Sequence, residues 1–342
     1  MSGCVEAGIW FPAVRTNTGT DVFTERLVEG LTNHGIRAEI TWLPLRAEYA
    51  PWTVAVPEPP DGANIVHVNS WLHERFISRH LPLVVTIHHA VHHPDARAYK
   101  GLLRAAYHRW WIAPNERRLL FRANRAVAVS KFVSESTRRS LLDVPMQVIY
   151  NGVDTAVFRP GIRRREPRGP FILLFIGSWM TRKGVDLLAP VMRELGEGFV
   201  LHYTGGSAAE RDKPRMPHNM IDIGRLRGDA AVAAAMQQVD ALLFPSRSEG
   251  FGLVAAEAMA CGLPVVATRN ASLVEVIVDD ETGVLCPPDD VAALAAAVRA
   301  LAADEPRYER LRKSAREWVV EHFSDEQMLQ NYLELYQEIL TP

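Results

Sequence analysis

Short apolar runs typical of buried strands alternate with helix-like stretches along this chain, and this alternation limits the folds that are open to it. In the first half, the expected strands are 7–11, 38–43, 64–68, 82–88, 125–129 and 147–150, with helices at 21–33, 99–122 and 131–142. In the second half, the expected strands are 171–177, 199–204, 220–223, 241–244, 264–268 and 283–285, with helices at 185–195, 229–238, 291–302, 308–322 and 325–340. Such alternation is typical of parallel sheets covered by helices on both faces. We therefore expect an α/β fold with two doubly wound sheets in series.

The stretch 158–170 interrupts the alternation. It contains three prolines and the arginine run 163–165, a composition typical of a linker. A chain of 342 residues also suits two domains of ordinary size. We place the first domain at 1–160 and the second at 161–324. The amphipathic end of the chain, 325–342, is expected to pack back on the first domain.

The amino-acid composition limits the binding partners and the cellular location that we expect for this protein. Lys and Arg total 38 against 40 Asp and Glu, a net charge of −2 that argues against nucleic acid as a partner. Cys4, Cys261 and Cys286 lack metal-ligand spacing and suit a reducing compartment. The N-terminus lacks the pattern of a signal peptide, and no apolar run approaches the roughly 18 residues that a membrane span needs. We expect a cytoplasmic protein, soluble or in peripheral contact with the inner face of a membrane.

The segment 245–264 carries the strongest functional signal. It joins two expected strands through a glycine-bearing loop and a short helix, whose first backbone N–H groups, at 251–253, form a natural anion site. Glu249 precedes the turn, and Glu257 lies about one turn inside the helix. Carboxylates repel a phosphate, so we expect them to accept hydrogen bonds from hydroxyl groups. This combination fits a sugar nucleotide, which has hydroxyl groups at both ends and a diphosphate between them.

The same segment resembles the Glu-x7-Glu signature of glycosyltransferase family 4, whose GT-B fold has two Rossmann-like domains facing across a cleft. The match covers 249–253 and 257–267. Other landmarks follow in the family's order, namely Asn151-Gly152-Val153-Asp154, Lys183-Gly184 and Thr282-Gly283. The likeness thus extends over most of the chain and is more specific in the second half.

The resemblance implies roles for the loop and helix residues. Glu257 would hold the ribose hydroxyl groups, and Glu249 the hydroxyl groups of the transferred sugar. The diphosphate would contact the backbone of the intervening turn, Gly250, Phe251, Gly252 and Leu253. Each role agrees with the chemistry expected from the residues themselves.

Lys183 is the next candidate, because the helix dipole disfavours a cation near a helix start unless an anion binds there. The family usually carries an arginine shortly after the preceding strand and a lysine about five residues later. This chain lacks the first arginine and has Ser178 in that region. Either Arg182 replaces it or one phosphate contact is missing. A solvated basic pair, Arg182 and Lys183, is the simpler alternative.

Loops at other strand ends supply further candidates. Gly19 lies between the first strand and the first helix, where the family's loop lines the cleft beneath the diphosphate. His88 ends a strand and resembles the histidine that touches the donor sugar. Gly205 and Arg225 follow strands of the second sheet and are expected beside the nucleobase.

A histidine cluster follows His88. His92, His93 and Asp95 are near enough in sequence to suggest a metal site, but no second group of ligands accompanies them. We therefore expect no metal and no cofactor besides the donor substrate.

The stretch 102–125 mixes Tyr107, Trp110, Trp111 and Phe121 with six arginines. The simpler interpretation is a long helix with a buried apolar stripe and solvated arginines. The alternative is an aromatic and basic face that lies on an anionic membrane.

These patterns together predict a retaining, metal-independent glycosyltransferase. It would move a hexose-type sugar from a nucleoside-diphosphate sugar to a hydroxyl group of a glycan, a glycolipid or a small molecule. His88, Glu249 and Lys183 are the expected catalytic residues. One alternative is a regulatory subunit that binds the nucleotide sugar without turnover, which the missing arginine would suit. The other is a glycoside hydrolase, which needs paired carboxylates but has no use for a phosphate site.

Overall fold

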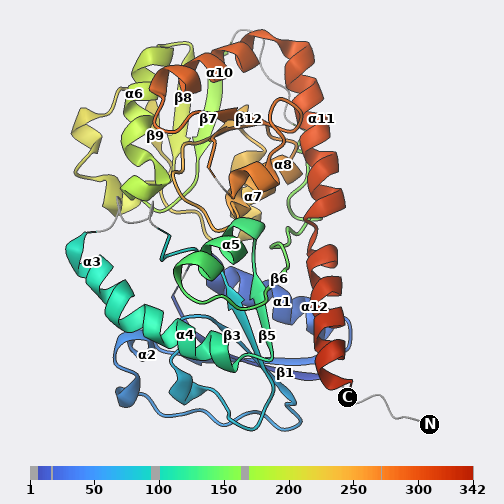
Figure 1. Ribbon diagram of the computed structural model, residues 1–342. Coiled ribbons are helices and arrows are strands. Elements are labelled where there is room, and N and C mark those ends of the chain that lie inside the picture. The colour runs from blue at the N-terminus through green and yellow to red at the C-terminus, as the bar shows by residue number, and fades with distance from the viewer. Residues whose placement is uncertain (1–6, 17, 94–100, 163–168, 271, 342) are drawn as a thin grey trace. The chain divides into compact units, whose positions relative to one another are not determined.

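The computed structural model describes residues 7–16, 18–93, 101–162, 169–270 and 272–341 (Figure 1). The chain forms two compact units. The first consists of Met1–Gly152 with Asp325–Pro342, and the second of Val153–Ser324. Each unit holds a six-stranded sheet whose paired strands run parallel, so the expected pair of parallel α/β sheets is confirmed.

The sheet of the first unit has the strand order β2-β1-β3-β4-β5-β6. Its strands are β1 (Gly8–Val14), β2 (Arg37–Leu43), β3 (Ile65–Asn69), β4 (Leu83–Ile87), β5 (Arg125–Ala128) and β6 (Gln147–Val148). Val84 and Val85, which point to opposite faces of β4, are both fully buried. The continuous apolar run of this strand therefore reflects helices on both faces.

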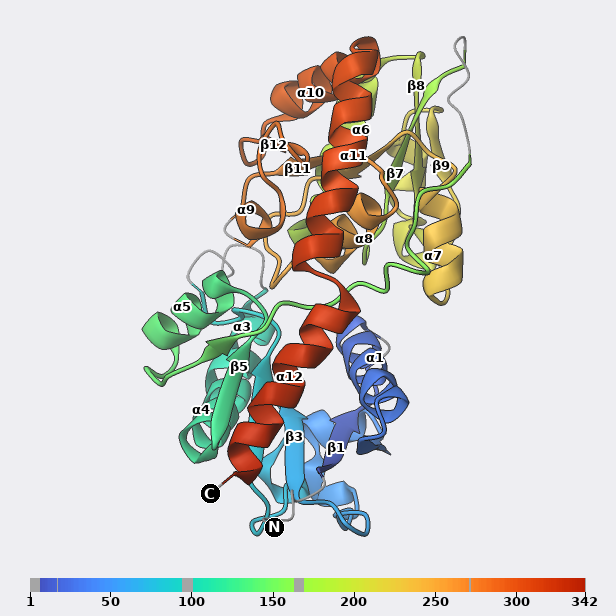
Figure 2. The ribbon, with the colours of Figure 1, turned by 90° about the vertical axis from the view of Figure 1, so that its right-hand side faces the viewer.

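The helices of the first unit are α1 (Gly19–Asn33), α2 (Arg46–Tyr49), α3 (Leu102–Tyr107), α4 (Ala113–Arg122), α5 (Lys131–Ser140) and α12 (Asp325–Leu340). Leu27 of α1 and Leu329 of α12 share one apolar core with Ile9 and Val84 of the sheet. Figures 1 and 2 show α4 and α5 on the other side of this sheet.

A buried polar chain attaches α12 to the first sheet. His67 Nδ1 lies 2.7 Å from the Tyr336 hydroxyl, and His67 Nε2 lies 2.7 Å from Thr86 Oγ1. The Tyr332 hydroxyl is 3.1 Å from the same Thr86 oxygen. Burial lowers the pKa of His67 to about 3, so the ring is neutral at ordinary pH. The last helix of the chain is thus held in the first unit by polar as well as apolar contacts.

The sheet of the second unit has the strand order β12-β11-β10-β7-β8-β9. Its strands are β7 (Phe171–Phe175), β8 (Phe199–Tyr203), β9 (Met220–Asp222), β10 (Ala241–Phe244), β11 (Val265–Thr268) and β12 (Val284–Cys286). The helices are α6 (Val185–Leu195), α7 (Asp229–Met236), α8 (Leu253–Ala260), α9 (Leu273–Val276), α10 (Val291–Ala303) and α11 (Glu305–His322). Leu188 of α6 and Leu294 of α10 pack with Leu173 of the central strand in one core.

The two units divide after Gly152, whereas the proline pattern placed the boundary between residues 160 and 161. The Val153 N–H donates to the Phe323 carbonyl at 2.8 Å. Arg316 of α11 donates to the carbonyls of Phe158 and Thr155. These contacts tie residues 153–158 to the second unit. Amino-acid composition alone does not predict them. The arginine run 163–165 and Cys4 lie outside the described residues.

The expected helix 99–122 is divided in the structure. Helices α3 and α4 flank a π-helical turn, His108–Ile112, and the backbone stays helical throughout. Residues 99 and 100 lie outside the described part. The sequence did not predict the short helices α2 and α9, because a helix of four residues is too short to show an apolar period. In the ranges described, no helix has both the length and the hydrophobicity that crossing a bilayer requires.

Candidate active site

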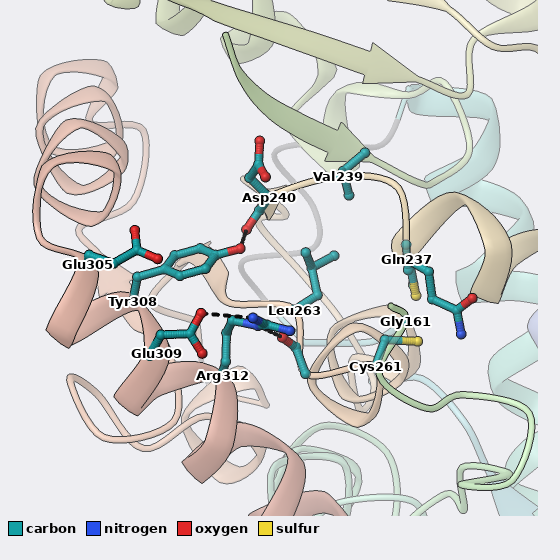
Figure 3. Close-up of a pocket in the computed structure, with 12 residues that line it drawn as sticks. Gly161, Gln237, Val239, Asp240, Cys261, Leu263, Glu305, Tyr308, Glu309 and Arg312 are labelled. Carbon is teal, nitrogen blue, oxygen red and sulfur yellow. Dashed lines mark hydrogen bonds and ion pairs between the residues drawn. The ribbon is translucent and has the colours of Figure 1, made fainter. Parts of the chain in front are cut away.

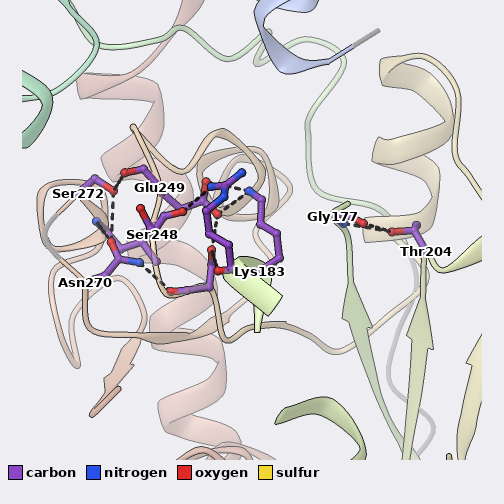
Figure 4. Close-up of polar contacts among 10 residues, drawn as sticks. Gly177, Lys183, Thr204, Ser248, Glu249, Asn270 and Ser272 are labelled. Carbon is purple, nitrogen blue, oxygen red and sulfur yellow. Dashed lines mark hydrogen bonds and ion pairs between the residues drawn. The ribbon is translucent and has the colours of Figure 1, made fainter. Parts of the chain in front are cut away.

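The Glu249 carboxylate and the Lys183 ammonium group form a largely buried ion pair in the second unit (Figure 4). Lys183 Nζ lies 2.6 Å from Oε1 and 2.9 Å from Oε2 of Glu249. The two side chains are only 15% and 6% exposed. Ser246 Oγ donates a further hydrogen bond to Oε1 at 2.6 Å. The structure thus brings two of the expected site residues into direct contact.

The environment of Glu249 keeps it ionised. Burial by itself raises the pKa of this carboxyl group, but the charges of Lys183 and Arg182 lower it, as do the hydrogen bonds from Lys183 and Ser246. The net result is a pKa below the usual value of 4.5. An ionised carboxylate only accepts hydrogen bonds, which is what recognition of a hydroxyl group requires.

Three strand ends of the second sheet position this pair. Lys183 follows β7, and Glu249 lies in the loop after β10. From the loop after β11, Asn270 Nδ2 donates to the Ser246 carbonyl at 2.8 Å, and Ser272 Oγ donates to the Glu249 carbonyl at 3.0 Å (Figure 4). The pair therefore lies at the carboxyl edge of a parallel sheet, where such sheets bind ligands.

Gly252 fixes the start of α8 beside Glu249. Its φ of 105° is left-handed, and a Cβ there would lie 2.4 Å from Leu273 Cδ2. Within the described ranges, the backbone N–H groups of Gly252, Leu253 and Val254 have no acceptor in the protein. Donors left open at a helix N-terminus favour an anion. Gly252 and Leu253 of the turn expected at 250–253 thus have open donors, and binding of a phosphate there stays a prediction.

Glu257 lies one helical turn after Leu253, as expected, and is 6% exposed. Its negative charge adds to the effect of burial on Cys261, whose pKa rises to about 12. That thiol therefore stays protonated and unreactive at neutral pH.

Arg182 and Arg247 brace the loops that carry the ion pair. Arg182 Nη1 donates to the Ser248 carbonyl at 2.7 Å. Arg247 donates to both oxygens of Asp186 at 2.6 and 2.7 Å and to Asp289 at 2.5 Å. These hydrogen bonds outweigh burial and raise the pKa of Arg247. Arg182, expected as a diphosphate ligand, thus has a structural contact as well.

Asp222 organises a glycine-rich edge at the ends of β8 and β9. Its Oδ1 accepts hydrogen bonds from the N–H groups of Gly205, Gly206 and Gly224 at 3.1, 3.2 and 2.9 Å. Lys213 Nζ lies 3.0 Å from Oδ2. Burial opposes ionisation, but these donors lower the pKa of Asp222 to about 2. The turn that carries Gly205 is therefore fixed by a permanent negative charge.

One further contact and one exposed cation complete this edge. The Gly177 N–H donates to Thr204 Oγ1 at 3.1 Å and so joins the ends of β7 and β8 (Figure 4). Arg225 follows the Asp222 turn and is exposed. Gly205 and Arg225 therefore lie at the same carboxyl edge of the sheet as Glu249.

In the first unit, Gly19 is the first residue of α1 and is exposed. Nothing lies within 4 Å of a Cβ built on it, and its φ is not in the left-handed region. The loop before it is fixed by Asp21, which accepts hydrogen bonds from the N–H of Thr16 at 2.9 Å and from its hydroxyl at 2.7 Å. The fold of the described chain therefore does not itself require glycine at position 19.

His88 directly follows β4 and is 5% exposed. Its Nε2 lies 2.8 Å from Asn69 Oδ1, an acceptor, so Nε2 carries the proton and Nδ1 is left as an acceptor. Burial, helped by the nearby rings of His89 and His67, lowers the pKa of His88 well below 6.5. The imidazole is thus neutral and fixed in one tautomer.

The histidines after His88 do not gather as metal ligands. His92 Nε2 lies 2.7 Å from Glu116 Oε2, and Ser70 Oγ donates to the other oxygen of Glu116 at 2.6 Å. His93 packs its ring against Phe132. Asp95 lies outside the described residues. Among the residues that are described, no group of three or more His, Cys, Asp or Glu side chains has the arrangement of a metal site.

Sequence reasoning missed most of the residues that position the site. They are Asn69 and Asp222, the last residues of β3 and β9, and Ser246, Arg247, Asn270 and Ser272, in the loops after β10 and β11. The first two, with Ser246 and Ser272, bond directly to His88, Gly205 or Glu249, whereas Arg247 and Asn270 bond to the carbonyls of Thr181 and Ser246 in the loops beside the ion pair. Their closeness to predicted strand ends was an available signal, since polar side chains there meet at one edge of a parallel sheet.

A cavity of about 450 Å³ lies elsewhere in the second unit (Figure 3). Asp240 and Leu263 line it, and both precede strands, so the cavity lies at the amino-terminal ends of β10 and β11. Its polar groups bond one another: the Tyr308 hydroxyl donates to the Asp240 carbonyl, and Arg312 contacts Glu309. It is therefore separate from the edge that holds Glu249.

A helix end with open N–H groups, a buried carboxylate and a largely buried cation at one sheet edge suit an enzyme or receptor for sugar nucleotides. Residues 162–318 match the model of the family Glycosyl transferases group 1, and residues 58–157 match that of Glycosyltransferase Family 4. The chain belongs to glycosyltransferase family 4, the glycosyl transferases group 1. The resemblance seen in the sequence is thereby confirmed.

Curated relatives agree with this family. A glycogen synthase of Mycobacterium tuberculosis is 30% identical over 281 residues, which cover 76% of this chain and 65% of that protein. A D-inositol 3-phosphate glycosyltransferase of Acidothermus cellulolyticus is 29% identical over 277 residues, covering 70% of this chain and 59% of that protein. The chain thus spans less than two thirds of the length of either relative.

Solved structures share the fold. Sucrose-phosphate synthase from Thermosynechococcus elongatus has a TM-score of 0.80 at 20% identity, over 97% of this chain and 99% of that one. HepE of Anabaena, solved in complex with UDP and glucose, has a TM-score of 0.71 at 17% identity, over 97% of this chain and 100% of that one. The GT-B class, with two Rossmann-like domains, is therefore confirmed.

Proposed function

We propose that this protein is a retaining, metal-independent glycosyltransferase. It moves a hexose-type sugar from a nucleoside-diphosphate sugar to a hydroxyl group of a glycan, a glycolipid or a small molecule. The observation that carries this proposal is the buried Lys183–Glu249 pair beside the open N–H groups of α8. A cation and a helix N-terminus suit the diphosphate, and the ionised carboxylate suits the hydroxyl groups of a sugar.

In this proposal, Lys183 and the start of α8 stabilise the negative charge that develops on the leaving diphosphate. Fixed donors and cations in a site shielded from water are the main electrostatic contribution to such a transfer. The Glu249 carboxylate neutralises Lys183 until the donor binds, and then accepts hydrogen bonds from the sugar. Glu257 binds the ribose, with Gly205 and Arg225 beside the nucleobase.

The first domain supplies Gly19 and His88. Gly19 leaves room for close approach of the backbone to the diphosphate. His88 is neutral, and its unprotonated Nδ1 accepts a hydrogen bond from the sugar. The leaving phosphate accepts the proton of the acceptor hydroxyl on the same face of the sugar, which retains the anomeric configuration.

A divalent metal has no task in this scheme, because Lys183 and the helix end provide the positive charge that the diphosphate needs. The enzyme would work in the cytoplasm, in peripheral contact with the membrane when its acceptor is lipid-linked.

The test is turnover of UDP-, GDP-, ADP-, TDP- and CDP-sugars by the full chain in EDTA, with octyl glucoside or D-inositol 3-phosphate as acceptor probe. Nucleoside diphosphate release together with a glycosylated product of retained anomeric configuration supports the proposal. Hydrolysis of a glycoside without nucleotide would show a hydrolase, and binding without release would show a regulatory subunit. Glu281→Gln changes an exposed carboxylate outside the proposed site and should leave turnover unchanged, so it is the control for substitutions of Glu249 and Glu257.

A further inference from the structure

The helical segment of α3, the π-helical turn and α4 exposes large apolar side chains to solvent. Leu102 and Leu103 are each 90% exposed, Trp110 is 73% exposed and Phe121 is 84% exposed. The opposite side of the same segment is buried and includes Ile112. A buried apolar stripe is present, as the simpler interpretation expects, and includes Leu119 and Leu120, but the four exposed side chains are not part of it.

Exposed aromatic side chains concentrate around this segment. Among the described residues, the Trp, Tyr and Phe side chains that are strongly exposed are Trp110, Phe121, Tyr49 and Trp52. Tyr49 ends α2, and Trp52 lies in the short 3-10 turn Pro51–Thr53 that follows. This stretch adjoins the segment, because the Trp52 and Trp111 rings have their centroids 6.2 Å apart. Trp111 also donates to the Glu48 carbonyl at 2.8 Å. The exposed aromatic residues thus belong to one region of the first unit.

The charge of this region is positive. Arg104 and Arg109 are exposed, and neither forms an ion pair with any described residue. Arg109 lies over the Trp110 ring at 5.3 Å. The neighbouring carboxylates are engaged, since Glu48 accepts a hydrogen bond from Tyr107 and Glu74 pairs with Arg118. The surface thus combines open guanidinium groups with aromatic and aliphatic side chains.

We propose that this face, the α3–α4 surface (Leu102, Leu103, Arg104, Arg109, Trp110 and Phe121), binds the surface of an anionic lipid bilayer. Trp and Phe side chains enter the interfacial layer, while arginines interact with lipid phosphates. The segment from Leu102 to Phe121 is about 30 Å long at 1.5 Å per residue, enough for several such contacts along the bilayer. Charge complementarity selects an anionic membrane as the occupant.

The membrane proposal rests on the proposed function, because membrane contact gives a glycosyltransferase access to lipid-linked acceptors. Binding to the bilayer itself requires neither donor nor turnover. Membrane binding is tested by sedimentation of the full chain with vesicles of phosphatidylcholine alone or of phosphatidylcholine with about 30% phosphatidylglycerol. The variants are Trp110→Ser/Phe121→Ser and Arg104→Gln/Arg109→Gln. Matched controls are Ile221→Ser/Val274→Ser and Arg211→Gln/Arg310→Gln, which change exposed residues of the second unit.

The expected result is binding to the anionic vesicles only, weakened by about tenfold or more in either surface variant and unchanged in the controls. Equal binding by wild type and both surface variants, or no binding by wild type, would overturn the proposal. Self-association without vesicles that disappears in Trp110→Ser/Phe121→Ser would overturn it in favour of a contact between copies. Nucleotide binding by the same variants is measured separately, so failure of the donor site and failure of the membrane surface are distinguishable.

Discussion

Lys183 and Glu249 are 66 positions apart in the sequence, yet the Lys183 ammonium group contacts both oxygens of the Glu249 carboxylate. Taking both charges out of water is costly, and a pair of this kind is often no more stabilising than two apolar side chains. Stability alone is therefore a weak reason for the pair. Its place at the carboxyl edge of the sheet favours a ligand that both groups contact.

Separating this pair should reduce stability and nucleotide binding through different effects. Glu249→Gln leaves the buried Lys183 without its counter-charge and should lower the free energy of unfolding by about 3–5 kcal/mol. Lys183→Met/Glu249→Leu should recover much of that stability, because no buried charge remains, but nucleotide affinity should stay low. Urea unfolding and calorimetric nucleotide titration measure the two effects. Tight nucleotide binding by the double variant would show that Lys183 and Glu249 are not part of the nucleotide site.

The lowered pKa of Glu249 sets the sign of a pH effect. A carboxyl group whose pKa falls on folding adds stability above its unfolded value, here near 4.5, and that stability is lost as the pH falls through the folded value. The difference in unfolding free energy between wild type and Glu249→Gln should therefore be constant near neutral pH and shrink below pH 4.5. Wild type and variant carry the same histidines, so the contribution of histidine titration to the pH dependence cancels in this difference. A difference that grows on acidification would contradict this assignment.

How much of the site was predictable depends on whether local or tertiary features determine each part. The apolar run before Pro245 and the glycine at 252 identified the β10–α8 unit, because strand, turn and helix start are local features. The contact between Lys183 and Glu249 was not predictable, since it depends on how the loops after β7 and β10 meet. Asn270 stabilises the contact between these two loops from a third loop. Its position after a predicted strand places it at the same edge of the sheet but does not reveal that it bonds to the Ser246 carbonyl.

The exposure of Trp110 was hidden for a different reason. A π-helical turn at His108–Ile112 adds residues to one helical turn and shifts the faces that follow it. An uninterrupted 3.6-residue period therefore assigns the wrong faces across this turn.

Gly19 offers a test that separates function from folding. A methyl group at this position enters open space, and alanine is a better helix former than glycine. Gly19→Ala should therefore leave the melting temperature unchanged or raised, while kcat/KM for the donor falls by about tenfold or more, equivalent to roughly 1.4 kcal/mol. Gly101→Ala, also directed into open space, is the control for the substitution itself. Unchanged kinetics in Gly19→Ala would place the α1 loop outside the donor site.

His88 should remain neutral across the working pH range. Burial lowers its pKa well below 6.5, and the contact with Asn69 selects the tautomer protonated at Nε2. Nitrogen NMR of labelled histidine, assigned with His88→Gln, should show this tautomer unchanged from pH 8 to about pH 6. A His88 signal that titrates near pH 6.5 would show instead that the ring is hydrated and protonates freely.

The measurement that tests the central claim most directly is thermal unfolding with UDP, GDP, ADP, TDP and CDP in the presence of EDTA. Our account predicts that one nucleotide raises the melting temperature by several degrees without metal, and that Lys183→Met/Glu249→Leu and Glu257→Ala abolish the shift. The exposed control Glu281→Gln should keep it. If none of the five nucleotides shifts the transition of the wild-type protein, the second unit does not hold a metal-independent nucleotide site and the account is wrong.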